Sequence, residues 1–184
     1  MTPTRVEMEL DGRTLSIETG KLAKQADGAT VLQFGETVVL GTVVRAAPRK
    51  GIDFFPLTVD YREKMNAAGK FPGGFRKREG PPNSKEILTM RNIDRPIRPL
   101  FPKGFMDEVQ IQCWVLAADG QNDSDVLAAI AASAALSISS VPFDGPIASV
   151  SVGRVDGQFV IMPTEAQMEY SDLDLLISGH KDGV

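Results

Sequence analysis

The sequence predicts an α+β fold in which a mixed β-sheet is packed against α-helices. Two observations lead to this class. The first sixty residues alternate apolar and polar side chains between tight turns, which is typical of strands, and the remainder mixes helical and extended patterns. With 184 residues, the chain has the size of one domain and can bury a core without the help of a disulfide or a metal.

The N-terminal third predicts two hairpins and a further strand. The expected hairpin strands are 5–10 and 13–18 around Asp11-Gly12, then 29–34 and 37–44 around Gly35-Glu36. Segment 37–44 is apolar on both faces, which indicates a central strand. Segment 54–61 predicts one more strand, with Pro56 near its start or on a sheet edge.

Two helices and four further strands are expected in the rest of the chain. The first helix begins at Asn83 or Ser84, with Glu86 placed for a capping box, and prolines 96 and 99 disturb its end. The second covers 123–139, is rich in alanine, and is expected to be capped by Asn122 with Asp125. The expected strands are 109–116, two segments flanking Asp156-Gly157, and 173–178.

Composition excludes several classes of site. The single cysteine, Cys113, excludes a disulfide framework and multi-cysteine zinc sites, and the single histidine, His180, excludes poly-histidine metal sites and the familiar His-based triads. We expect Cys113 and Trp114 in the core and His180 at the surface. No apolar run reaches the roughly 20 residues of a membrane span, and the N-terminus resembles neither a signal nor a transit peptide. These features predict a cytoplasmic protein without a membrane partner.

Basic residues are concentrated in one part of the chain. Between residues 62 and 103, eleven Lys and Arg oppose four Asp and Glu, a formal charge of +7, whereas the rest of the chain carries −11 within the total of −4. A basic segment on an acidic body is a candidate polyanion site, because electric fields act locally. The alternative on charge alone is a solvated helix face.

Segment 66–82 is the first candidate site. Four glycines and three prolines predict a long loop, and a loop of this length is usually functional or disordered. It carries Phe75, Arg76, Lys77 and Arg78, and a ring beside cations suits single-stranded nucleic acid, since bases stack on the ring and phosphates meet the cations. An ordinary flexible basic loop is the alternative.

The second candidate site is an arginine face. Arg91, Arg95 and Arg98 are spaced four and three residues apart and would project from one side of a helix, where arginine can grip phosphate with two hydrogen bonds. A salt-bridged helix surface, with Asp94 orienting one arginine, is the alternative.

Carboxylates form the third candidate. Asp119, Asp123 and Asp125 precede the second helix, and Asp123 and Asp125 fit helix caps and dipole partners better than a site. Asp172 and Asp174 would share one face of the last strand and could hold a magnesium ion.

Several motifs together resemble the bacterial polynucleotide phosphorylase family, specifically the first of its two RNase PH-like core domains. The matching stretches are 18–28, 35–40, 53–59, 67–74 and, most specifically, 93–101 (Ile-Asp-Arg-Pro-Ile-Arg-Pro-Leu-Phe). The resemblance implies a ring-shaped homotrimer that degrades RNA from its 3′ end with inorganic phosphate, reversibly and with Mg²⁺, alongside a second core, a helical linker, and KH and OB-fold domains. It implies that residues 1–184 are the first core of a longer protein, with degradosome components as possible partners.

The resemblance also implies that phosphate and metal are bound by the second core and RNA by the first. Where the catalytic core has a serine-rich phosphate loop, this chain has Asp123-Ser124-Asp125, and two carboxylates there would repel phosphate. The two aspartates and the lysine of the catalytic core match Met168, Asp174 and Leu176. We therefore expect no catalytic and no metal-binding residue in this domain.

RNA-contacting positions carry over with changes. The family's pore loop typically reads Phe-Phe-Arg-Arg and here reads Phe75-Arg76-Lys77-Arg78, so weaker stacking and a steeper salt dependence are expected. Pro81 replaces a frequent arginine. Arg91, Arg95 and Arg98 match positions along the family's RNA cleft. The alternatives are a stand-alone RNase PH-type exoribonuclease subunit and a purely structural ring subunit.

Overall fold

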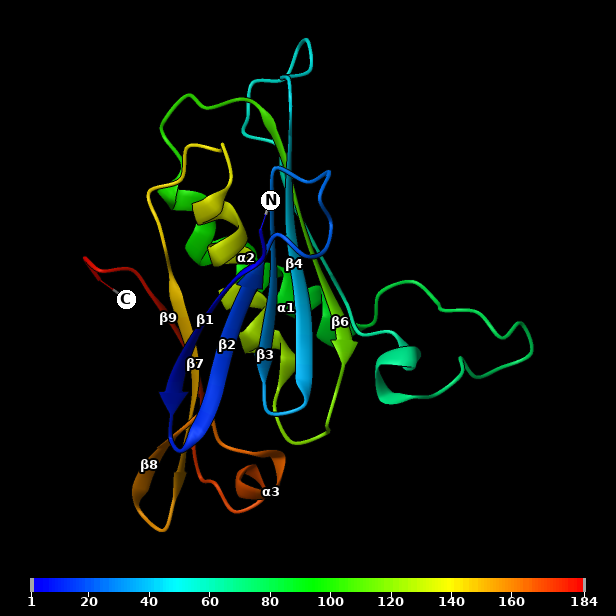
Figure 1. The fold of residues 1–184 in the computed structure, drawn as a ribbon, viewed down its shortest axis with the longest axis vertical. Helices are drawn as coiled ribbons and strands as arrows, with labels where there is room; N and C mark the ends of the chain where they lie inside the picture. Colours follow the sequence, from blue (N-terminus) through cyan, green and yellow to red (C-terminus); the bar gives the residue numbers. More distant parts are fainter. Residues whose placement is uncertain (1, 184) are drawn as a thin grey trace.

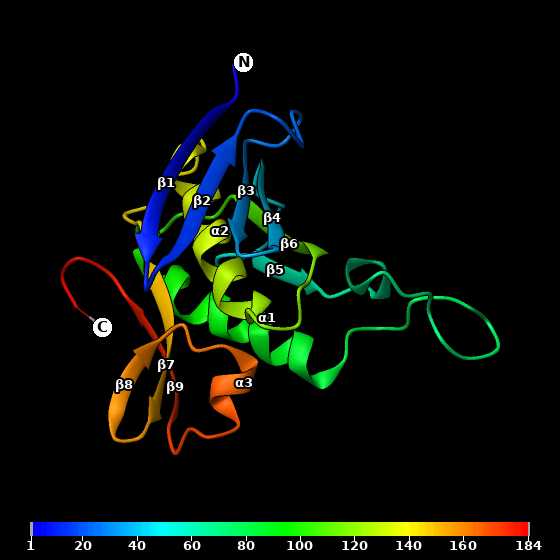
Figure 2. The same cartoon turned by 60° about the horizontal axis from the view of Figure 1, so that its bottom comes forward.

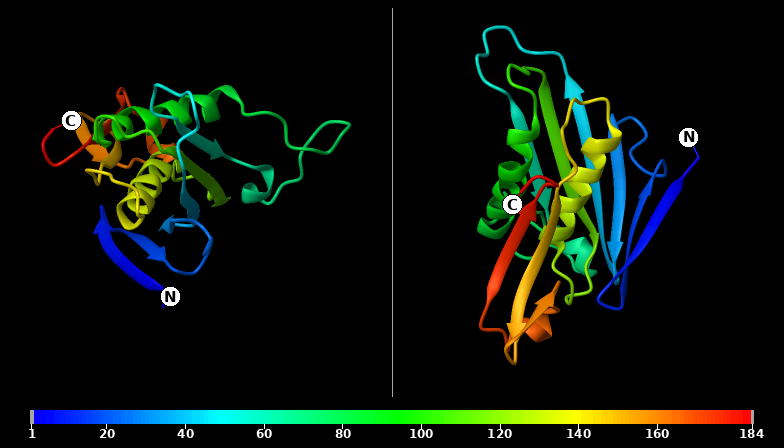
Figure 3. Two further views of the ribbon diagram at one scale, coloured as in Figure 1. Left: turned by 90° about the horizontal axis from the view of Figure 1, so that it is seen from above. Right: turned by 90° about the vertical axis from the view of Figure 1, so that its left-hand side faces the viewer.

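The structure is a computed structural model that describes residues 2–183. Six strands form the main sheet in the order β1-β2-β3-β4-β6-β5, and three more form a second sheet in the order β8-β7-β9 (Figure 1). Helix α2 lies between the two sheets and contacts β3 and β4 on one side and β7 on the other (Figure 3). The predicted α+β class with a mixed sheet is confirmed.

Both predicted hairpins are present, each slightly longer than expected. The strands are β1 (Thr4–Leu10), β2 (Arg13–Thr19), β3 (Gly28–Phe34) and β4 (Thr37–Ala46), all antiparallel to their neighbours. Strand β4 lies between β3 and β6 and is therefore interior, as its apolar character predicted.

Strands β5 (Leu57–Arg62) and β6 (Glu108–Ala117) complete the sheet and run parallel to each other, whereas β6 is antiparallel to β4. Strand β5 lies at the edge and begins directly after Pro56, the position where proline does not interrupt a ladder. Because β5 and β6 are parallel, the chain must cross over between them, and this crossover contains segment 66–82 and the first helix.

Helix α1 (Ser84–Ile97) begins with the predicted capping box: the Asn83 side chain accepts from the Glu86 N–H, and the Glu86 carboxylate accepts from the Asn83 N–H. The helix continues through Pro96 for one residue and passes into a 3₁₀ turn, η2 (Arg98–Leu100). Proline is tolerated here because only the last turn loses a hydrogen bond.

Helix α2 (Ser124–Ile138) packs closely on the sheet. Gly28 and Gly41 face it, and a methyl group on either would collide with the backbone of Ala135 or Ala131. The predicted Asn122 and Asp123 caps are wrong, because the Asp123 side chain at the N-cap makes no capping bond and the Asn122 side chain instead joins Arg13 and Asp119. Asp125 does lie in the first turn, where its carboxylate accepts from the Val126 N–H. The start of α2 is thus fastened to the sheet by tertiary contacts.

The second sheet consists of the hairpin β7 (Ala148–Val155) and β8 (Gln158–Ile161) around Asp156-Gly157, with β9 (Asp174–Gly179) on the other side of β7. A short helix, α3 (Glu165–Met168), joins β8 to β9, and its first N–H donates to the Gln121 carbonyl just before α2.

Cys113 is buried as expected, but Trp114 is only half-buried and carries the Lys64 ammonium 4.0 Å above its ring. His180, expected at the surface, is half-buried. It lies in a turn after β9 that is closed by the bridge between His180 and Gly183.

Among residues 2–183, no helix combines the length and the apolar character that a membrane crossing requires.

Candidate nucleic-acid interface

Residues 63–83 form an arm that projects from the body of the molecule beside β5 and α1 (Figure 2). One short 3₁₀ turn, η1 (Met65–Ala68), is its only helical part, and residues 69–82 are irregular. Phe75, Arg76, Lys77 and Arg78 are all exposed near the tip, and the Phe75 side chain is 103% exposed. The structure thus brings these four predicted residues together on one projecting segment.

The hydrogen bonds that hold the arm lie at its base. The Arg62 guanidinium donates to the Gly80 carbonyl at 2.9 Å, and the Glu79 carboxylate accepts from the Met65 N–H at 3.0 Å, so the two ends of the arm are joined side by side. Glu86 connects this base to α1, since its carboxylate accepts from the Glu63 N–H at 3.0 Å and faces Arg62 at 3.6 Å. We define Arg62, Glu79 and Glu86 as the clasp.

Glu86→Gln is expected to loosen the clasp. Glu86 is 5% exposed, and its carboxylate serves the capping box, the Glu63 N–H and Arg62 together. Losing the charge should lower the free energy of unfolding by about 1–2 kcal/mol, because the half-buried Arg62 loses its charged partner. Hydrogen exchange of the Glu63 and Met65 amides should accelerate at the same time. The exposed substitution Glu169→Gln is the control, and equal exchange in both variants would show that Glu86 does not fasten the arm.

The clasp also determines where positive charge remains free. All four acidic residues of the basic segment are engaged: Glu63 with Lys85, Glu86 with Arg62, Asp94 with Arg98, and Glu79 with a backbone amide. Within the described part of the chain, eight cations of this segment make no ion pair: Lys64, which lies over the Trp114 ring, and Lys70, Arg76, Lys77, Arg78, Arg91, Arg95 and Lys103. The unneutralised charge therefore lies on the arm, on the exposed surface of α1 and at Lys103.

The three predicted arginines of α1 differ in their surroundings. Arg91 and Arg95 are exposed, and Arg91 lines a groove of about 280 Å³ between α1 and β5. Arg98 lines the same groove but is held by Asp94 through two hydrogen bonds of 2.6 and 2.9 Å, and it also donates to the Phe55 and Leu57 carbonyls. Its donors fasten the end of α1 to the start of β5, so Arg91 and Arg95 are the better placed to meet a phosphate.

A polar cluster lies between the base of the arm and the start of α2. The Lys85 ammonium is 3.2 Å from both Glu63 and Asp123, and the buried Tyr61 hydroxyl bonds Glu63 and Ser124. Burial, and then the hydrogen bond to Glu63, raise the pKa of Tyr61, so this hydroxyl stays protonated. Burial alone would lower the pKa of Lys85, but the two carboxylates raise it above its usual range.

Asp125 belongs to the same cluster. Burial, and then the neighbouring Asp123 carboxylate, raise the pKa of Asp125 to about 7. The acidic groups of this cluster lie at the first turn of α2, where a phosphate bound to that helix would have to approach them. The Lys85 ammonium is already shared by Glu63 and Asp123. Such a site disfavours a second anion.

Asp125→Asn is expected to stabilise the protein above neutral pH. The folded pKa of about 7 lies above the unfolded value of about 4, so the folded state binds this proton more tightly, and stability falls as pH rises through that window. Asparagine removes the penalty, and the free energy of unfolding at pH 8 should rise by about 1–2 kcal/mol, with little change at pH 4. Denaturant titrations at both pH values test this, with the exposed Asp53→Asn as control. An equal effect at both pH values would contradict the assignment.

Asp119 and Asp172 are both held by protein hydrogen-bond donors. Asp119 accepts hydrogen bonds from the amides of Gln121 and Asn122, and although burial opposes it, these bonds hold the pKa of Asp119 far below its usual range. Asp172 pairs with Arg154 through two hydrogen bonds and lies before β9, outside the strand on which it was expected to share a face with Asp174. Among residues 2–183, no group of three or more His, Cys, Asp or Glu is placed to hold a metal ion.

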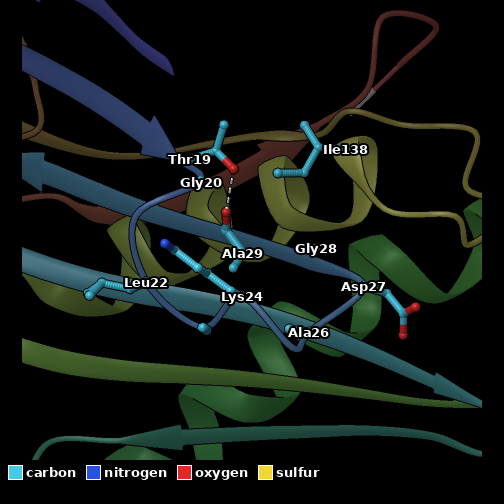
Figure 4. Close-up of a pocket in the computed structure, with 10 residues that line it drawn as sticks. Thr19, Gly20, Leu22, Lys24, Ala26, Asp27, Gly28, Ala29 and Ile138 are labelled. Atoms are coloured by element: carbon cyan, nitrogen blue, oxygen red, sulfur yellow. Dashed lines mark hydrogen bonds between the residues drawn. The ribbon is translucent and has the colours of Figure 1, made fainter. Parts of the chain in front are cut away.

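A separate cavity of about 400 Å³ lies between the segment after β2 and the end of α2, and no residue of the arm lines it (Figure 4). Its lining includes Leu22, Lys24, Asp27 and Ile138. Asp27 accepts from the Arg45 amide, and Lys24 is the basic residue of the lining. The walls are mainly apolar side chains and backbone, and Lys24 and Asp27 are the charged residues among them.

Two family models match consecutive parts of the chain. The model of the 3′ exoribonuclease family, domain 1, matches residues 11–142, and domain 2 of the same family matches residues 145–184. The chain belongs to the 3′ exoribonuclease (RNase PH) family. The boundary between the two RNase PH matches falls between α2 and β7, where the chain leaves the main sheet for the second one.

Curated RNase PH-family relatives share more than half of their residues with this chain. Polyribonucleotide nucleotidyltransferases from Rhodopirellula baltica and Geobacter sulfurreducens are 58% and 57% identical to it, and the alignments cover 98% and 100% of this chain but 24% and 26% of the relatives. These identities confirm the resemblance to bacterial polynucleotide phosphorylase. The chain spans about a quarter of the length of the curated relatives it matches.

Solved structures confirm the RNase PH-like fold. A chain of the Archaeoglobus fulgidus exosome with RNA bound to the active site superposes with a TM-score of 0.67 at 18% identity, covering 98% of this chain and 73% of that one. Rice (Oryza sativa) Rrp46 gives a TM-score of 0.68 at 14% identity, with coverages of 98% and 74%. At such identities the likeness is one of fold.

Sequence reasoning missed the clasp, Tyr61 and a second exposed ring on the arm, Phe71. The clasp and Tyr61 depend on contacts between residues far apart in the sequence and carry no local signal. Phe71, between Lys70 and Pro72 in the same glycine-rich loop, could have been noticed, since nothing in a loop of glycines and prolines offers to bury a phenylalanine.

Proposed function

We propose that residues 1–184 form the first RNase PH-like core domain of a phosphorolytic 3′-to-5′ exoribonuclease, a polyribonucleotide nucleotidyltransferase, and that this domain grips single-stranded RNA. The observation that carries the proposal is the arm, which presents an exposed ring and three unpaired cations on a segment fastened at its base. Rings and cations together suit a strand with accessible bases.

RNA, inorganic phosphate and a trimeric ring follow from the proposed function. In such an enzyme a phosphate oxygen attacks the terminal phosphodiester and a nucleoside diphosphate leaves, and the reverse reaction lengthens the chain. The names of the curated relatives and the exosome titles of the structural neighbours support RNA as the substrate and a ring as the assembly. A homotrimer, a cytoplasmic location and degradosome partners stay predictions.

Within this scheme the described domain contributes binding and not chemistry. The first turn of α2 carries Asp123 and Asp125 where a phosphate would have to enter, and their only nearby ammonium, that of Lys85, is already shared with Glu63. Nearby, α3 begins against Gln121, and Met168 stands at a position that the resemblance compares with a catalytic aspartate. Mg²⁺ does not fit here either, since Asp119 and Asp123 are occupied by protein donors. We assign Mg²⁺ to another part of the enzyme.

The test uses the 184-residue chain, a 3′-labelled oligoadenylate, inorganic phosphate and Mg²⁺. We expect saturable RNA binding without release of nucleoside diphosphate. Release of labelled ADP would overturn the non-catalytic assignment and favour a stand-alone exoribonuclease subunit. Absence of RNA binding, both by this chain and by the arm of the full-length protein, would favour a purely structural ring subunit.

A further inference from the structure

Phe71 and Phe75 are the two most exposed large apolar side chains in the described part of the protein. Phe71 is 90% exposed and Phe75 is 103% exposed, whereas the next in order, Tyr170 and Phe159, are 78% and 70% exposed. Both lie on the arm, four residues apart. Exposed single apolar residues are ordinary, but two almost fully exposed rings on one projecting segment point to a partner.

The surroundings of Phe71 indicate the chemistry of that partner. Lys70 precedes it, and the tip cations Arg76, Lys77 and Arg78 follow it within a few residues. The one carboxylate of the tip region, that of Glu79, is turned back to the Met65 amide, so no free negative charge accompanies the rings. Flat apolar faces among unpaired cations match single-stranded RNA, in which each base has a face that stacks and each nucleotide carries a phosphate.

The backbone prepares Phe71 for this contact. A residue before proline is restricted to extended conformations, so Pro72 reduces the freedom that Phe71 would otherwise lose on binding. Gly73 and Gly74 follow with open space at their Cβ positions, and the Phe71 ring itself is 90% exposed. An exposed ring on a restricted backbone loses less conformational freedom on binding, which favours a stacking site.

We propose that Phe71 is a second stacking residue, so that the arm holds RNA by two rings, Phe71 and Phe75, and not by Phe75 alone. This inference rests on the proposed function. It also changes an expectation from the sequence. The loop carries Arg76 where a second ring is common in the family, and Phe71 supplies a ring from the opposite side of the two glycines. The arm then offers two rings for stacking, and the weaker stacking expected from the sequence does not follow.

The experiment compares the full-length protein with Phe71→Ala, Phe71→Leu and Phe71→Trp, using an oligoadenylate and an abasic strand of equal length. Stacking is worth about 1–3 kcal/mol per base, so Phe71→Ala should lose about tenfold or more in affinity for oligoadenylate and almost nothing for the abasic strand. Leucine should not restore binding, because it lacks a flat π-face, and tryptophan should restore it with fluorescence quenching by the bases. Phe54→Ala is the matched control, since Phe54 is 62% exposed on a different loop.

The slope of affinity against salt separates this role from that of the cations. Phe71→Ala removes no charge, so the slope should stay unchanged while the affinity falls. Wild-type affinity in Phe71→Ala, full rescue by leucine, or an equal loss on the abasic strand would each overturn the stacking role while leaving RNA binding by the arm intact. If the unaltered protein bound neither strand, the proposed function would fail and this inference with it.

Discussion

Replacing Arg76, Lys77 and Arg78 together with alanine is expected to weaken binding of single-stranded RNA by about a hundredfold near 0.1 M salt. Each phosphate contact to a single strand contributes about 0.7 to the slope of log affinity against log salt, so three contacts contribute about 2. The three side chains are exposed and make no ion pair among the described residues, so their removal should change the stability of the fold little. Fluorescence anisotropy across a salt series measures both the affinity and the slope.

The matched control removes Lys24, Lys50 and Lys181 together. These three are also exposed or half-exposed, make no ion pair among the residues that the structure describes, and give the same change in net charge away from the arm. Their loss should leave the slope nearly unchanged. If both triple variants lost equal affinity, binding would depend on the total charge of the protein and not on the arm.

Gly28→Ala is expected to lower the free energy of unfolding by about 3–5 kcal/mol, or to prevent folding, because overpacking against rigid backbone is among the most costly core changes. A methyl group at Gly28 would stand 2.1 Å from the Ala135 carbonyl oxygen, and neither β3 nor α2 can move without disturbing the other. Urea denaturation followed by circular dichroism gives the value.

Gly80→Ala is the control for Gly28→Ala. Gly80 has open space around its Cβ position and lies at the base of the arm, where alanine keeps the carbonyl that accepts from Arg62. The free energy of unfolding of the Gly80→Ala protein should differ from that of the unaltered protein by less than about 1 kcal/mol. A Gly28→Ala protein as stable as the Gly80→Ala protein would show that α2 does not pack on β3 as closely as described.

Local patterns predict most of the fold. Alternation, the Asp-Gly turns and the capping box of Asn83 and Glu86 each act over a few residues, so the hairpins and the start of α1 follow from them. The caps of α2 do not follow, because Asn122 is drawn to Arg13, which lies on β2 and is distant in sequence. The half-buried position of His180 does not follow either, because no local pattern predicts the turn that His180 and Gly183 close after β9.

The candidate site was predictable in composition but not in charge balance. The sequence shows that residues 62–103 carry a net positive charge, whereas the structure shows which of their cations are paired with carboxylates. Arg62, Lys85 and Arg98 look equivalent to Arg76 in the sequence, yet each has a carboxylate partner, and Arg98 is also bound by two carbonyls. Only the three-dimensional structure distinguishes the cations that are paired within the protein from those that remain free to bind a ligand.

Photocrosslinking tests most directly whether the arm grips RNA. An oligonucleotide containing 4-thiouridine would be bound to the full-length protein with inorganic phosphate omitted, irradiated, and the crosslinked peptides identified by mass spectrometry. The arm, residues 63–83, should carry major crosslinks, at Phe71 and Phe75 above all, with further ones near Arg91 and Arg95. Crosslinks confined to the sheet β8-β7-β9 or to the cavity beside Lys24, with none on the arm, would contradict the assignment.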